Sequence, residues 1–181
     1  MMITKTMGVV ALVCISIILS MTAVVGTLGV IAPIPNEATA QQQQGVQEFD
    51  AMLTGAAEVP PVQTSASGSA ELEVVDNGNR LEYVIGVSNI DRVTQAHIHQ
   101  GTSTEAGPVV ATLFNASTPT GPMTGELIAG SITSANLEGP LQGKQLSDLI
   151  ALMQNGQAYV NVHTEQNPDG EIRGTIVADT D

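Results

Sequence analysis

The sequence predicts an all-β domain, an antiparallel β-sandwich or barrel with one short helix near residues 145–155. From residue 48 onward, short runs rich in Val, Ile and Leu alternate with clusters of Gly, Pro, Asn, Asp and Ser. This spacing is typical of strands joined by turns. The strongest turn signals are DNGN (76–79) and NPDG (167–170), each with a glycine where a turn requires a positive φ. Strands joined so tightly pair in the antiparallel sense.

The expected strands follow one another along the chain and are bounded by turn residues or prolines. One segment departs from this pattern, because apolar residues recur at helical spacing between Leu146 and Met153 and Asn155-Gly156 supplies a C-cap. We therefore expect a helix over 145–155 that covers one end or an open edge of the sheets. The expected strands are Glu48–Leu53, Ser69–Val75, Arg80–Ser88, Thr94–His99, Pro108–Phe114, Glu126–Thr133, Gln157–Thr164 and Glu171–Val177.

Composition and charge exclude several kinds of partner. The chain has two Phe, two Tyr and no Trp, so the core must be built from Val, Ile, Leu and Ala, and a stacking platform for bases or sugars is not expected. The net charge of −13 argues against nucleic acid and anionic lipid head groups, because both require basic patches. Such a charge suits an extracellular protein or one that attracts cations.

The N-terminus has the features of a targeting segment. Lys5 is the only charge in the first 36 residues, the stretch 8–34 is almost wholly apolar, and Ala38-Thr39-Ala40 forms an A-x-A type cleavage site. A secretory signal cleaved after Ala40 is the leading interpretation. An uncleaved membrane anchor is the alternative, because the apolar stretch is long enough to span a bilayer. In both cases the domain lies outside the cell or at its surface.

The chain then divides into residues 1–40 as signal peptide or anchor, 41–47 as a polar leader, 48–177 as the β domain and 178–181 as a tail. The only cysteine, Cys14, lies in the apolar segment, so the domain has no disulfide and depends on its core. Contact with a membrane is expected only through an uncleaved N-terminal segment. An extracellular protein or an envelope component is the expected partner.

The three histidines of the chain lie in two runs that read as strands, QAHIHQG (95–101) and AYVNVHT (158–164). A strand directs residues i and i+2 to the same face. His97 and His99 therefore share a face, and His163 lies on the polar face of its own run. All three imidazoles are expected to point away from the apolar side.

This arrangement favours a copper or zinc site formed by His97, His99 and His163, with a fourth position open. Binding should weaken below about pH 6, where imidazoles of ordinary pKa become protonated. The His-x-His strand is similar to that of copper/zinc superoxide dismutases, which are also β-sandwiches, although three histidines do not complete their ligand set. In the alternative interpretation the rings are structural, bonded to polar neighbours at a loop corner.

Asn161 and Glu171 are expected beside the histidines, where Glu171 could accept a hydrogen bond from an imidazole N–H and so orient a metal ligand. A simple ion pair between Glu171 and Arg173 is the alternative. Because the polar face is expected to be less buried than the apolar one, Asn161→Asp should be tolerated, whereas Asp at Val160 or Val162 should unfold the domain.

Signatures of hydrolytic enzymes are missing from the sequence. It contains no G-x-S-x-G motif and no glycine-rich phosphate loop, and residues 41–181 contain no cysteine nucleophile. No catalytic residue is assigned, and the protein is not expected to be an enzyme. Asn115-Ala116-Ser117 is a glycosylation sequon at a strand end, which makes Asn115 a candidate acceptor.

Four motifs in order carry a family resemblance: FDAMLTGAAEVPPV (49–62), AHIHQG (96–101), GPVVATL (107–113) and AYVNVHTEQNPDGEIRG (158–174). Together they resemble the CHRD domain, named for its repeats in chordin, over roughly residues 48–177. The resemblance implies an extracellular β-sandwich or barrel, of immunoglobulin-like or superoxide-dismutase-like type, without a defined activity. The expected function is a secreted or cell-surface binding or structural module, and the alternative is a copper- or zinc-binding extracellular protein.

Overall fold

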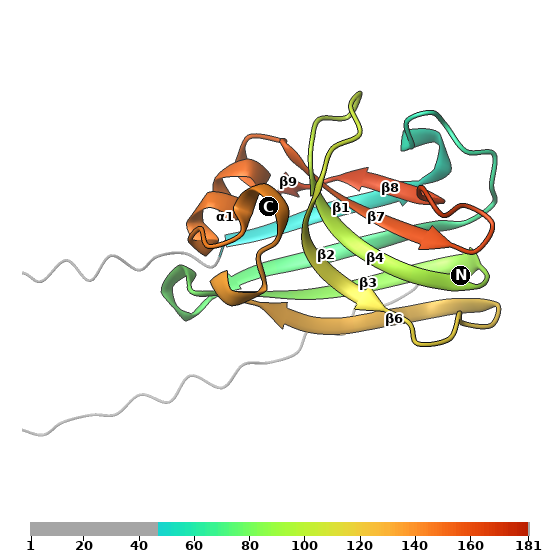
Figure 1. Ribbon diagram of the computed structural model, residues 1–181, viewed down its shortest axis with the longest axis horizontal. Helices are drawn as coiled ribbons and strands as arrows, with labels where there is room; N and C mark the ends of the chain where they lie inside the picture. The colour runs from blue at the N-terminus through green and yellow to red at the C-terminus, as the bar shows by residue number, and fades with distance from the viewer. Residues whose placement is uncertain (1–46, 181) are drawn as a thin grey trace, which may run out of the picture. The chain divides into compact units, whose positions relative to one another are not determined.

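The structure, a computed structural model, describes residues 47–180. These residues form a nine-stranded antiparallel sheet in the order β5-β4-β7-β8-β1-β2-β3-β6, with β9 paired beside β1. The sheet curls into a nearly closed barrel with one helix, as Figure 1 shows, which confirms the predicted all-β fold. The strands are β1 (Gln47–Thr54), β2 (Ser67–Val75), β3 (Arg80–Ile90), β4 (Val93–Gln100), β5 (Val109–Asn115), β6 (Met123–Ile132), β7 (Ala158–Thr164), β8 (Ile172–Thr175) and β9 (Val177–Ala178).

The two ends of the sheet, β5 and β6, are brought together by the chain that follows β6. Glu138 N–H donates to the Val110 carbonyl at 2.8 Å, and Ala111 forms a β-bridge with Leu137. Tyr83 on β3 also reaches β5, because its hydroxyl donates to the Leu113 carbonyl at 2.7 Å. These bonds satisfy carbonyl groups along the outer edge of β5. Without them this edge would be open to pairing with another chain.

The barrel interior is apolar and is filled mainly by Val, Ile, Leu and Ala, as the composition predicts. Strand β3 shows the underlying alternation, since every second residue from Leu81 to Val87 is buried. Phe49 and Tyr83 are the aromatic side chains of this interior. Short 3-10 helices lie in the connections between the strands. They are Gly55–Ala57, Asp76–Gly78, Ser134–Asn136 and Gly139–Leu141.

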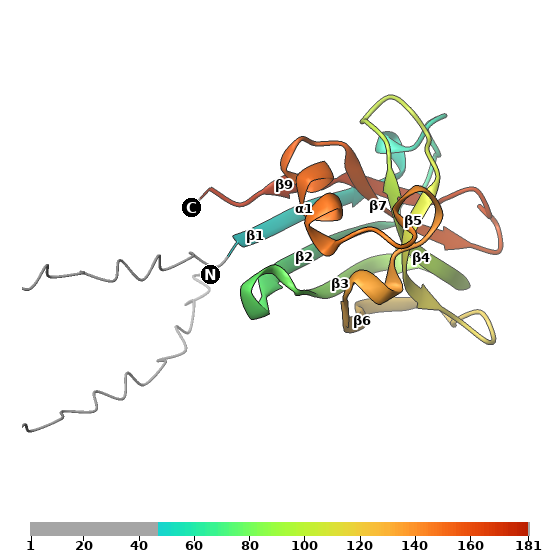
Figure 2. The ribbon, with the colours of Figure 1, turned by 60° about the vertical axis from the view of Figure 1, so that its left-hand side comes forward.

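The predicted helix is present as α1 (Leu146–Gln154). Its first turn is capped by Asp148, whose carboxylate accepts a hydrogen bond from Gln145 N–H at 3.0 Å. It buries four apolar residues at helical spacing and ends before Gly156, which has a φ of 64°. Figure 2 shows α1 beside β1 and β9 at one end of the barrel, where it covers the core.

Most strand ends lie within two residues of the predicted ones, and two larger differences have physical reasons. Strand β6 begins at Met123 rather than Glu126, because a bulge opposite β3, with Gly125 at a φ of 134°, lets the end of the Pro- and Gly-rich loop join the sheet. The last predicted strand is divided at Ile176. Residues before it pair with β7 and residues after it pair with β1.

The expectation that the polar face of β7 is less buried than its apolar face is wrong. All seven residues of β7 are buried, and Asn161 is only 3% exposed. Three segments cover the outer face of β4, β7 and β8, namely 55–66, 101–108 and 165–171, as the hydrogen bonds described below show. The structure therefore has an apolar core inside the barrel and a second, polar buried layer outside it.

The predicted signal or anchor (1–40) and nearly all of the predicted leader (41–47) lie outside the described residues. Among residues 47–180, no helix has the length and apolar character needed to cross a bilayer.

Candidate metal centre

The structure brings His97, His99 and His163 together in the polar layer. The two strands that carry them, β4 and β7, are paired antiparallel neighbours. The ligand nitrogens of the three rings all lie within 4.8 Å of one another. Each side chain is buried, with an exposed fraction of 7–8%. In residues 47–180 these histidines are the one group of His, Cys, Asp or Glu side chains arranged closely enough to hold a metal ion.

Backbone carbonyls fix the protonation of two of the rings. His99 Nδ1 lies 2.9 Å from the Gly107 carbonyl, and His163 Nδ1 lies 3.0 Å from the Pro168 carbonyl. Because a carbonyl can only accept, each Nδ1 carries the proton and each Nε2 presents a lone pair. This is the arrangement found in metal-binding histidines, whose second nitrogen donates to a carbonyl or carboxylate.

The Nε2 lone pairs of His99 and His163 point into the cluster, and one of them is unpartnered. His163 Nε2 lies 3.1 Å from His97 Nδ1, which must therefore donate to it. His99 Nε2 is buried and has no hydrogen-bond partner. An unpartnered buried acceptor is costly, and a bound cation would satisfy it.

Burial keeps the three imidazoles neutral. It lowers the pKa of His97 to about 4, with a further contribution from His163 and His99 beside it. Burial also lowers the pKa of His99 and His163, although the carbonyl hydrogen bonds of Gly107 and Pro168 partly oppose the change. A metal ion would thus meet little competition from protons at neutral pH. With these lowered pKa values, protonation of the imidazoles themselves would displace a bound ion only at a pH lower than the value of about 6 expected from an ordinary imidazole pKa.

A stack of side chains holds His99 in place. The Tyr159 ring is parallel to the His99 ring, and the Arg173 guanidinium lies 3.6 Å above the centre of Tyr159 on β7. Arg173 Nη2 donates to the carbonyls of Thr102 and Glu105, and so ties down the segment 101–108. No role was predicted for Tyr159, although its position on the polar face of β7 places it with the histidines.

Glu171 does not have the role expected for it. Its carboxylate accepts hydrogen bonds from Thr64 at 2.6 Å and Thr164 at 2.7 Å, and so joins segment 55–66 to β7. The carbonyls of Gly107 and Pro168 take the place that was expected for Glu171. Both the threonine hydroxyls and the imidazole N–H groups can donate a hydrogen bond to a carboxylate. Sequence spacing alone could not show which of these donors Glu171 would meet.

Asn161 is the cross-strand neighbour of His97, but its described hydrogen bond is to the Asp169 carbonyl, with Nδ2 at 3.5 Å. Its Oδ1 is buried and unpartnered. Glu58, which sequence reasoning missed, is 6% exposed and also has a buried oxygen, Oε1, without a partner. Burial raises the pKa of Glu58 to about 7, against an opposing effect of the Arg173 charge.

The predicted glycosylation acceptor, Asn115, is exposed at the end of β5. It pairs with Gln95 on β4, two residues before His97, so this position lies on the strand next to the histidines.

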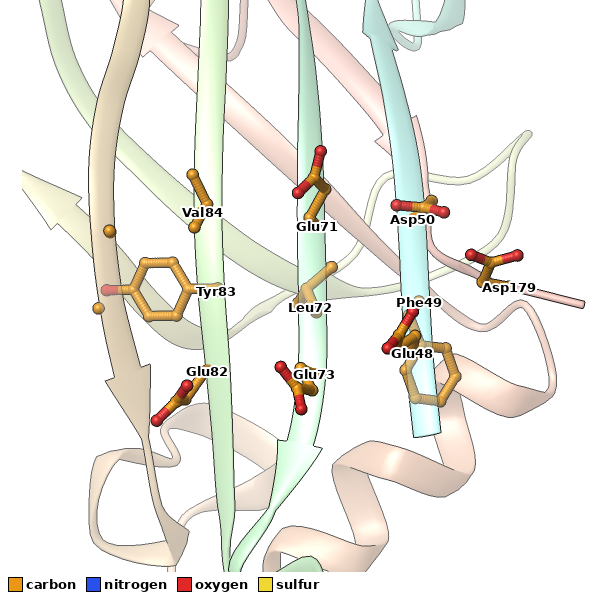
Figure 3. A pocket seen from close by; sticks show the side chains of 12 residues that line it. Glu48, Phe49, Asp50, Glu71, Leu72, Glu73, Glu82, Tyr83, Val84 and Asp179 are labelled. Carbon is orange, nitrogen blue, oxygen red and sulfur yellow. The ribbon is translucent and has the colours of Figure 1, made fainter. Parts of the chain in front are cut away.

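A separate groove of about 560 Å³ lies on the outer face of β1, β2 and β3. Figure 3 shows its carboxylates, with Glu48, Glu73 and Glu82 in a row across the three strands. Like charges at paired positions repel one another, so this face is electrostatically unfavourable and attracts cations. Three exposed apolar residues share the outer side of these strands and of β9: Met52, Val84 and Val177.

The ligand set of the centre suits copper or zinc. Three neutral imidazole nitrogens match these ions, whereas calcium and magnesium require several oxygen ligands. The three histidines would leave a fourth coordination position for water or another ligand.

Comparison with protein families gives one match, in which the CHRD domain model covers residues 49–176. No curated protein and no solved structure matches the chain significantly.

Proposed function

The chain belongs to the CHRD domain family, and from this premise we propose that it is an exported, non-enzymatic module that binds copper or zinc through His97, His99 and His163. One observation carries the proposal, namely that three buried imidazoles bring their ligand nitrogens within 4.8 Å of one another. A structural role for the histidines would not require a buried lone pair on His99 Nε2 that lacks a donor.

The electrostatics of the whole chain support a cation as the ligand. The net charge is −13, and the acidic groove adds a local concentration of carboxylates. Such a field raises the concentration of cations near the surface and speeds their association. Export is supported by the N-terminal apolar segment and its Ala38-Thr39-Ala40 site.

A second candidate function is the binding of an extracellular protein or envelope component. It is favoured by the outer face of β1, β2 and β3, where carboxylates lie beside the exposed apolar side chains Met52 and Val84. A partner with basic and apolar groups would relieve both the charge repulsion and the exposure. Charge reversal at Glu73 should weaken such a complex without changing metal binding.

Titration of the purified metal-free protein with Zn²⁺ and with Cu²⁺ tests the first proposal. We expect one ion per chain, and binding at least about tenfold weaker in His99→Gln and His163→Gln, since each removes one ligand. Gln142→Ala, at an exposed position, is the matched control and should bind as the unmodified protein does. Binding no tighter than that of a variant with all three histidines replaced would refute the metal site.

A further inference from the structure

Three buried side-chain atoms in residues 47–180 have no hydrogen-bond partner: Glu58 Oε1, His99 Nε2 and Asn161 Oδ1. The lone pair of His99 belongs to the metal centre. The other two are both oxygens, which can only accept while the carboxyl is ionised, and they come from different parts of the chain, segment 55–66 and β7. Two buried acceptors without a donor require an explanation.

Both oxygens face the same side of Gly170. A Cβ placed on Gly170 would lie 2.7 Å from Glu58 Oε1 and 2.5 and 2.6 Å from Asn161 Nδ2 and Oδ1, so the carboxyl and the amide converge on the same small space. Gly170 also has a φ of 131°, which disfavours a side chain at this position. The close approach of the turn is what brings the carboxyl and the amide together.

One proton would satisfy both oxygens, because a protonated carboxyl donates a single hydrogen bond to an amide oxygen. A second metal ion is a poorer occupant, because one carboxylate and one amide oxygen are too few ligands to hold it. The direction of the Glu58 pKa, raised by burial, agrees with a neutral carboxyl.

We propose that Glu58 is a neutral carboxylic acid that donates its proton to Asn161 Oδ1, and that it releases this proton when a cation binds at His97, His99 and His163. The release rests on the proposed metal-binding function. In this step the O–H bond of Glu58 breaks, its electron pair stays on the carboxylate, and the proton passes to solvent.

The coupling follows from position and charge. Asn161 is paired with His97 across β4 and β7, and Glu58 Oε1 converges with Asn161 Oδ1 beside Gly170. A cation there stabilises the carboxylate form, and by reciprocity the carboxylate strengthens binding of the cation. The other charged or titratable groups around this pair are Arg173 on β8, His163 on β7 and Asp169 in segment 165–171.

The proposal assigns the pH dependence of binding near neutrality to Glu58. Zinc affinity should therefore rise about five- to tenfold between pH 6 and pH 8, as the proton on Glu58 ceases to compete. In Glu58→Gln, whose amide can still donate to Asn161, this rise should disappear.

The first experiment uses the metal-free protein. The ¹³C carboxyl signal of Glu58, identified by its loss in Glu58→Gln, should titrate with a midpoint near pH 7. A midpoint in the ordinary range of glutamate would overturn the proposal, whatever the protein does with metals.

The second experiment is calorimetric titration with Zn²⁺ at pH 6 in buffers of different ionisation enthalpy. The unmodified protein and the control Glu71→Gln should release protons on binding, and Glu58→Gln should release markedly fewer. Equal proton release by all three proteins would overturn the coupling. The coupling would also be overturned if the unmodified protein bound two zinc ions and Glu58→Gln bound only one, because Glu58 would then be a metal ligand. If zinc does not bind at all, the proposed function and the coupling both fail, and the ¹³C titration alone decides whether Glu58 is a neutral acid.

Discussion

Tyr159 lies parallel to His99, with the ring centroids 4.9 Å apart and an angle of 12° between the ring planes. The two residues also share Gly107: its N–H donates to the Tyr159 hydroxyl at 3.0 Å, and its carbonyl accepts from His99 Nδ1 at 2.9 Å. One tyrosine therefore fixes both the plane of the His99 ring, a proposed metal ligand, and the peptide that sets its protonation.

Removal of the Tyr159 hydroxyl should weaken the centre. In Tyr159→Phe the Gly107 N–H loses its acceptor, so we expect a loss of about 1–2 kcal/mol in the free energy of unfolding and of about tenfold in metal affinity. Urea denaturation and zinc titration measure the two effects. Tyr83→Phe is the control, because it loses the hydrogen bond to Leu113 and should be destabilised without loss of zinc affinity. Equal affinities of the two variants would contradict the role given to Tyr159.

Acidic substitutions on β7 test the burial of both its faces. Val160→Asp should unfold the domain, since its side chain is fully buried in the core. Asn161→Asp should also destabilise it, by more than about 2 kcal/mol at pH 8, because a second carboxylate would be placed beside Glu58. Thermal melts should show no such effect for Thr118→Asp, at an exposed position in the loop after β5. A melt of Asn161→Asp like that of the unmodified protein would mean that this layer admits water.

Gly170 should not tolerate a side chain. Its φ of 131° and the close oxygens of Asn161 and Glu58 predict that Gly170→Ala loses about 2–3 kcal/mol in the free energy of unfolding. Gly121→Ala has open space around the added Cβ and should change stability by less than about 1 kcal/mol. Chemical denaturation of both variants checks this, and similar values would argue against the tight turn.

The metal-free protein should lose stability as the pH falls from about 6.5 toward 4. In this range the unfolded chain takes up a proton on His97 while the folded protein does not, because burial lowers the pKa of His97 to about 4. Each such proton contributes at most about 1.4 kcal/mol per pH unit. The melting temperature against pH should fall less steeply for His97→Gln. Parallel curves would show that His97 is not buried in its neutral form.

Local signals in the sequence were sufficient for the fold. The alternation of β3, the apolar spacing of α1 and the glycine of the turn 167–170 depend on neighbours in the chain, and each is confirmed. The bulge in β6 was not predicted, because it results from pairing with β3. Its only local sign in the sequence is a glycine, Gly125.

The candidate centre was predictable only in part. A strand period of two places His97 and His99 on one face, but the adjacency of β4 and β7 is a property of the whole sheet. The roles of Glu58 and Glu171 depend on how segment 55–66 folds over the strands. No periodic pattern encodes the path of such a segment, so the sequence could not separate the buried acid from the many exposed ones.

The histidine pair that closes the centre, His97 and His163, is separated by 66 positions in the chain. An unfolded chain offers an ion only the adjacent pair His97 and His99, and the third ligand arrives after β7 has docked against β4. Closing so long a loop is slow and entropically costly, so the complete ligand set forms late in folding. A nascent or partly folded chain would therefore bind metal weakly. An ion bound after β7 has paired with β4 would stabilise the folded barrel relative to partly folded states.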